Sequence, residues 1–174
     1  MNPRPARVER AHESDFTTRP DPSGPIQEEP SVATTRVART AWEGSLLDGK
    51  GNVSLVTSGV GEFPVTWASR AETANGKTSP EELIAAAHSS CFSMALSHGL
   101  TGAGTPPTLL ETEAEVTFQP GTGITGIHLT VTGTVPGLDE AGFVKAAEDA
   151  KANCPVSQAL SGTTITLTAG LAQA

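Results

Sequence analysis

Aromatic side chains are scarce in this chain. Its 174 residues include no tyrosine, two tryptophans and five phenylalanines, so aromatic rings can fill only a small part of a core. Packing must rest mainly on Ala, Val, Leu, Ile and Thr. No segment approaches the roughly 20 consecutive apolar residues that a bilayer-spanning helix needs, and no apolar signal stretch stands near the start. We therefore expect a soluble, cytoplasmic protein that does not associate with membranes.

Positive charge and cysteine are also in short supply. Eleven Lys and Arg residues against nineteen Asp and Glu residues give a net charge of −8, which argues against nucleic acid as a partner because its phosphates would be repelled. The only cysteines are Cys91 and Cys154. In a reducing compartment, two cysteines favour a transient or catalytic disulfide over a permanent one. No metal, flavin or nucleotide motif is present, so no cofactor is expected.

The length suits one domain with a tail. Residues 1–34 contain six prolines and ten charged side chains of both signs, without an apolar period that could bury one face. This composition predicts a disordered or extended N-terminal arm, followed by a single domain over residues 35–174.

The first half of that domain predicts strands followed by one long helix. Alternation over 36–44, a turn at 48–51 and a second strand at 52–57 predict a hairpin, and a third strand is expected at 64–71. The helix start is marked by Ser79 as N-cap, by a proline at the first helical position and by Glu82, which is placed to complete a capping box.

From Leu83 to about Leu100 almost every residue is apolar or small. A helix without a polar face is expected to lie in the middle of a structure. The small run Ala85–Ala87 would allow the central helix of a dimer mate to approach closely, or it simply reflects helix propensity.

The second half predicts two antiparallel strands, an amphipathic helix and a closing strand. The strands are expected at 110–118 and 125–135, the helix at 138–152, and the closing strand at 163–168, after a short helical turn that begins at Cys154-Pro155. The order of elements predicts an α+β layered fold.

The two thiols differ in their predicted surroundings. Cys154 stands at the N-cap of the short helical turn, where the helix dipole favours the thiolate. Cys91 is twelve residues past its own N-cap and needs a cation from elsewhere, because apolar surroundings alone raise a thiol pKa. Four of the few basic residues are arginines of the arm. Arg70 is the best remaining candidate, with an ordinary surface arginine as the alternative.

Two separated motifs carry a resemblance to a known family. The segment 78–97, TSPEELIAAAHSSCFSMALS, and the segment 153–158, NCPVSQ, closely resemble the osmotically inducible branch of the OsmC/Ohr peroxidase family. The likeness runs from about residue 40 to 167 and leaves the arm uncovered. Because both motifs occur in the right order and spacing, the resemblance is specific.

The resemblance implies a fold and a set of site residues. The family fold is an α+β arrangement of antiparallel sheets around a long central helix, in an intertwined homodimer. By similarity, Cys91 is the peroxidatic cysteine, Cys154 the resolving cysteine, Arg70 the arginine that polarises the thiolate, and Glu81 the carboxylate that holds the arginine. Helix position favours Cys154 as the more acidic thiol, whereas the resemblance assigns the first attack to Cys91. The two assignments agree if Arg70 has the larger effect on the Cys91 pKa.

The resemblance also implies a function. It predicts a thiol-dependent peroxidase acting on organic hydroperoxides, with hydrogen peroxide as a second candidate substrate, and reset by an external dithiol of a lipoyl or similar type. Glu81 and Cys91 are about 15 Å apart along one helix at ~1.5 Å per residue. Glu81 therefore reaches either the Cys91 of a partner chain or its own Cys91 through the length of Arg70. We expect sites at the dimer interface.

Several alternatives stay open at this point. Cys91, His88 and His98 could bind zinc, although a packed core histidine explains His88 more simply. Ser157 and Gln158 could stabilise the turn or the peroxide. Four side chains form an apolar pocket or ordinary core: Phe63, Trp67, Phe92 and Met94. Glu111, Glu113 and Glu115 are most simply a solvated strand face.

The main rival function is a non-catalytic stress protein that binds a small hydrophobic ligand at the dimer interface. A structural disulfide in an exported protein is a second rival, disfavoured by the missing signal segment.

Overall fold

The computed structural model describes residues 32–172, so most of the predicted arm, 1–34, lies outside the described residues. Residues from Arg36 onward form one compact unit. Its elements in chain order are β1 (Arg39–Glu43), β2 (Lys50–Ser54), β3 (Glu62–Val65), α1 (Trp67–Ala71), α2 (Pro80–Gly102), β4 (Leu109–Gln119), β5 (Gly123–Thr134), α3 (Glu140–Asn153), α4 (Pro155–Ala159) and β6 (Ile165–Leu171). The mixture of strands and helices agrees with the predicted α+β class.

The first sheet contains the predicted hairpin. β1 and β2 pair antiparallel, and β3 adds antiparallel to the other edge of β2. The prediction of a strand over 64–71 is wrong beyond Val65, because 67–71 form α1. Thr66 and Ser69 cap this helix reciprocally: the Ser69 amide donates to Thr66 Oγ1 at 3.1 Å and the Thr66 amide donates to Ser69 Oγ at 3.0 Å. This local capping box outweighs the strand-like composition.

Helix α2 begins as predicted, with one difference at its cap. The Glu82 amide donates to Ser79 Oγ at 3.1 Å. The Glu82 carboxylate does not return to the cap but accepts a 2.6 Å hydrogen bond from Thr78 Oγ1, so the carboxylate half of the predicted capping box is wrong. The helix buries one face, through residues four apart: His88, Phe92, Leu96 and Leu100.

The opposite face of α2 is open in the single chain. Met94 is 66% exposed, and Ala86, Ala87 and Ser90 are also exposed. No element of residues 32–172 covers this face, so the expectation that α2 lies in the middle of a structure, packed against a dimer mate, stays a prediction.

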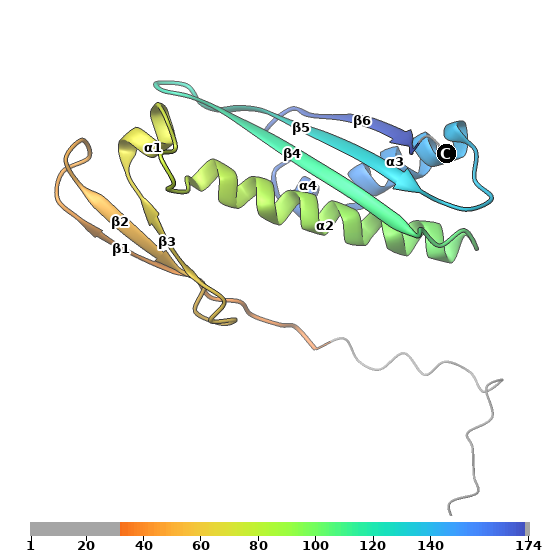
Figure 1. Ribbon diagram of the computed structural model, residues 1–174, viewed down its shortest axis with the longest axis horizontal. Helices are drawn as coiled ribbons and strands as arrows, with labels where there is room; N and C mark the ends of the chain where they lie inside the picture. Colours follow the sequence, from red (N-terminus) through yellow and green to blue (C-terminus); the bar gives the residue numbers. More distant parts are fainter. Residues whose placement is uncertain (1–31, 173–174) are drawn as a thin grey trace, which may run out of the picture. The chain divides into compact units, whose positions relative to one another are not determined.

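The second sheet has the order β4-β5-β6. β4 and β5 form a long antiparallel pair, as predicted, whereas β6 joins β5 in parallel. A parallel pair needs a long connection, because the chain must return to the end of the sheet at which β5 starts. Helices α3 and α4 lie in this connection between β5 and β6. Figure 1 shows α2 running along β4.

The core lies between the second sheet and helices α2 and α3. Phe92 and Leu96 from α2 pack with Leu129 of β5 and with Phe143 of α3, all fully buried. The outward face of β4 carries the three predicted solvent-exposed carboxylates, Glu111, Glu113 and Glu115. Within residues 32–172, no helix has the length and apolar content needed to cross a bilayer.

Candidate active site

The fold brings the two thiols into contact. Cys91 lies about halfway along α2, and Cys154 forms the junction between α3 and α4, where it is the C-cap of one helix and the N-cap of the next. Although 63 residues separate them in sequence, the Cys91 and Cys154 thiols lie close enough for each to shift the pKa of the other. Both are free cysteines, so the contact joins two thiols and not the two halves of a disulfide.

The two thiols differ in their access to solvent. Cys154 is fully buried within the core. Cys91 is half-buried and lines a groove of about 780 Å³ between α2 and α3, with largely apolar walls that include Ala95, Ala146 and Ala150. A small molecule arriving from solvent would therefore meet Cys91 first.

The order of acidity of the two thiols is opposite to the order of their access to solvent. Burial by itself raises the Cys154 pKa, but contacts with the Ser157 amide, the Cys91 thiol and the Ser157 hydroxyl outweigh burial and leave the pKa lowered. These are close polar contacts, since Cys154 makes no side-chain cap hydrogen bond of regular geometry. The Cys91 pKa is raised, first by burial and then by the neighbouring Cys154, against one lowering contact from the Val156 amide.

In the single chain Cys154 is thus the more acidic thiol, as its N-cap position suggests. Cys91 has no cation among the described residues to favour its thiolate.

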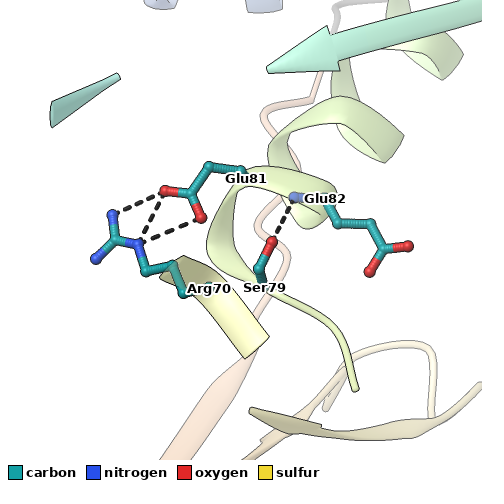
Figure 2. Close-up of polar contacts among 4 residues, drawn as sticks. All are labelled: Arg70, Ser79, Glu81 and Glu82. Carbon is teal, nitrogen blue, oxygen red and sulfur yellow. Dashed lines mark hydrogen bonds and ion pairs between the residues drawn. The ribbon is translucent and has the colours of Figure 1, made fainter. Parts of the chain in front are cut away.

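Arg70 and Glu81 form an anchored ion pair (Figure 2). Arg70 Nη2 lies 2.8 Å from Glu81 Oε1, and Arg70 Nε donates to Oε1 at 3.0 Å and to Oε2 at 3.3 Å. Glu81 is buried, at 6% exposure, in the first turn of α2, where the helix dipole favours a carboxylate. The guanidinium carbon also lies 4.0 Å from the centre of the Phe118 ring. Arg70 is therefore held in place and is not an ordinary surface arginine.

The arginine pair and the thiol pair are separate within the chain. Glu81 and Cys91 are ten residues apart on one helix, about 15 Å along its axis. In the part of the chain that the structure describes, no hydrogen bond or ion pair joins Arg70 to either sulfur. The predicted site residues thus form two halves, one with the sulfurs and one with the cation.

His88 is a buried, hydrogen-bonded histidine. It is fully enclosed, and its Nε2 lies 2.8 Å from Ser157 Oγ. Burial lowers the His88 pKa, which keeps the ring neutral at neutral pH. His98 is exposed on α2, and among residues 32–172 no three metal-ligating side chains gather to hold an ion.

Ser157 was expected to stabilise either the turn or the peroxide, and its contacts with His88 and Cys154 were not predicted. Its spacing offered a signal, because a residue three places after an N-cap has its amide near the cap side chain. The four apolar candidates do not line one pocket. Phe92 is core, Trp67 packs edge-on against Phe118, and Met94 borders the groove beside Cys91.

Comparison with known proteins places this geometry in a family. The OsmC-like protein family matches residues 73–168. Peroxiredoxin OsmC of Escherichia coli is 45% identical over 122 residues, which cover 68% of this chain and 85% of the relative, and the Shigella flexneri protein of the same name matches equally.

Solved structures agree on the fold. An organic hydroperoxide resistance protein from Elizabethkingia anophelis aligns with a TM-score of 0.62 at 25% identity, covering 82% of this chain and 99% of the other. An OsmC-like protein from Mycoplasma pneumoniae aligns with a TM-score of 0.64 at 11% identity, covering 82% and 100%. The sequence and fold together show that this chain belongs to the OsmC-like protein family.

Proposed function

We propose that this protein is a thiol-dependent peroxidase that reduces organic hydroperoxides through Cys91 and Cys154. The observation that carries the proposal is the pairing of a groove-facing Cys91 with a buried Cys154 in direct contact. The names of the relatives, a peroxiredoxin and an organic hydroperoxide resistance protein, support the same chemistry. Hydrogen peroxide is a second candidate substrate, and a reducing cytoplasm suits a chain with two free thiols.

The first step forms one bond and breaks one. The Cys91 thiolate attacks the terminal peroxide oxygen, the O–O bond breaks, and the alkoxide leaves and takes up a proton to become the alcohol. The sulfur is oxidised to a sulfenic acid. The apolar walls of the groove beside Cys91, from Ala95, Ala146 and Ala150, suit the hydrocarbon part of an organic hydroperoxide.

The second step closes the disulfide. The Cys154 thiolate attacks the Cys91 sulfenic sulfur, an S–S bond forms, the S–O bond breaks, and the released hydroxide is protonated to water. An external dithiol, of a lipoyl or similar type, then reduces the disulfide through a mixed disulfide and is itself oxidised. Protein sulfur carries all these steps in the proposal, without a cofactor.

Activation of Cys91 requires the arginine half of the site, which a second copy of the chain would deliver. Cys91 needs a cation because burial raises its pKa, and Arg70 is anchored about 15 Å away on its own chain. The exposed face of α2 and the thin first sheet support a dimer: within the described residues, the hydrophobic side chains that β1–β3 bury are Val53 and Val65. In a homodimer, the partner's Arg70, held by the partner's Glu81, would face Cys91.

A binding role without catalysis is the second candidate. The apolar groove between α2 and α3 is large enough for a small hydrophobic ligand. In that case Cys91 would behave as an unactivated thiol, since burial raises its pKa in the single chain.

A stoichiometric experiment tests the peroxidase. The reduced protein, freed of reductant, receives one equivalent of cumene hydroperoxide, and free thiols and intact mass are followed. The wild type should lose both thiols rapidly and its mass should fall by two hydrogens. Cys154→Ser should trap a sulfenic acid on Cys91, and Cys91→Ser should leave the peroxide unconsumed. Thiols that persist for hours would contradict the peroxidase and leave the binding role.

A further inference from the structure

A buried row of polar side chains leads from His88 through Ser157 to the Cys154 sulfur. His88 Nε2 lies 2.8 Å from Ser157 Oγ, and both side chains are closed off from solvent at 0% and 6% exposure. Ser157 stands one helical turn after Cys154 on α4, and its hydroxyl and amide lie close enough to the Cys154 sulfur to lower the thiol pKa, although Cys154 makes no side-chain cap hydrogen bond of regular geometry. The proposed function uses Cys154, but it assigns no task to His88 or to the Ser157 hydroxyl.

The number of available protons decides which group donates in each contact between His88, Ser157 and Cys154. A serine hydroxyl has one proton to donate, so Ser157 cannot donate to His88 and to Cys154 at once. If His88 carries its proton on Nε2, it donates to Ser157 Oγ and leaves the hydroxyl proton free for the sulfur. His88 Nδ1 has no hydrogen-bond partner among residues 32–172, so placing the proton there would bury an unpaired donor. Both arguments favour the Nε2–H tautomer.

We propose that His88 is a positioning residue: by donating from Nε2 to Ser157 Oγ, it holds the Ser157 hydroxyl in the orientation that donates to the Cys154 thiolate. The inference rests on the proposed two-cysteine function and extends it to the resolving step. Once Cys91 is oxidised, its thiol proton is no longer available to Cys154. Of the two side-chain donors, the Ser157 hydroxyl then remains.

The surroundings favour a donor role for His88 over a base. Burial lowers the His88 pKa, and no described carboxylate pairs with the ring. Taking the Cys154 proton would therefore leave an uncompensated buried imidazolium. The titratable group in contact with Cys154 is Cys91 of α2. On α3, the nearby charges Lys151 and Glu148 form an ion pair with each other.

The test uses a titration that does not depend on turnover. In full-length Cys91→Ser, Cys154 is the only thiol, and the chain has no tyrosine. The ultraviolet absorbance of the thiolate can then be followed against pH without tyrosinate. Adding His88→Leu should raise the midpoint by about one pH unit, the effect of losing one hydrogen bond to a charged group. His88→Gln keeps an N–H donor at the end of the side chain and should restore most of the shift.

Three further variants separate positioning from folding. Ser157→Ala should shift the midpoint as far as His88→Leu, and the two changes together should add nothing, because they act on one donor. His98→Leu, on the exposed part of the same helix, serves as the matched control and should leave the midpoint unchanged. An unaltered midpoint in His88→Leu, or equal shifts in His88→Leu and His88→Gln, would overturn the proposal.

In chains with both cysteines, His88→Leu should slow disulfide formation about tenfold at pH values below the titration midpoint of Cys154, because fewer Cys154 side chains are ionised. The rate of Cys91 sulfenic acid formation should not change. If Cys91 never reacts with peroxide, the proposed function fails while the titration still decides the role of His88.

Discussion

At the residue scale, the Arg70–Glu81 pair allows catalysis and folding to be separated. Arg70→Met should lower peroxide turnover about 100-fold or more, since it removes the cation proposed to stabilise the Cys91 thiolate. It should also destabilise the fold by roughly 3 kcal/mol, because Glu81 is left buried without a partner. Arg70→Lys should recover part of the turnover and part of the stability, since an ammonium keeps the charge but loses the bidentate contact with Glu81.

The double variant Arg70→Met/Glu81→Leu is the control for that experiment. It removes both charges and fills the space with apolar side chains, which should return most of the stability. Turnover should stay low. Recovery of turnover together with stability, measured by urea unfolding and peroxide consumption, would show that Arg70 acts only through the fold.

The elements depend on close packing where β5 meets α3. A Cβ atom added at Gly133 would lie 2.4 Å from Cε2 and 2.5 Å from Cζ of Phe143, so the ring or the strand would have to shift. The ring is fully buried, which makes that shift costly. Gly133→Ala should therefore destabilise the protein by about 1–3 kcal/mol. Gly126→Ala is the matched control on the same strand, because the nearest atom, Thr164 O, is 4.0 Å from the new Cβ. Urea midpoints at equal protein concentration compare them, and equal midpoints would refute this packing argument.

The elements also show what the sequence can and cannot predict. Helix α2 was predicted because its start is encoded locally, by Ser79 as cap and a proline at the first position. Helix α1 was missed because its capping box uses Ser69 in place of the usual Glu or Gln, within a segment that alternates like a strand. The parallel β5–β6 pairing is a long-range choice with no local signature. The contacts of Ser157 likewise depend on where α2 meets α4.

At the scale of the whole molecule, the candidate site is incomplete in one chain. The family resemblance predicted both halves, and the contact of Cys91 with Cys154 is present. Arg70 and Glu81 lie together but apart from the sulfurs. Sequence could not decide which chain supplies the cation. Glu81 and Cys91 are ten residues apart on one helix, so Arg70 can approach a Cys91 only through contacts between distant parts of one chain or between two chains, and neither kind of contact has a local signature in the sequence.

Mixing two inactive variants tests whether the site is shared between chains. Arg70→Met keeps a good Cys91, and Cys91→Ser keeps a good Arg70. If a partner's Arg70 serves each Cys91, a mixed dimer contains one complete site. Unfolding and refolding the two variants together at equal amounts should then give about a quarter of wild-type turnover, because half the dimers are mixed and each has one working site of two. Wild type carried through the same refolding sets the scale. Turnover no higher than the sum of the separate variants would mean that each chain uses its own arginine, and Arg70 would then have to swing along α2 to reach its own Cys91.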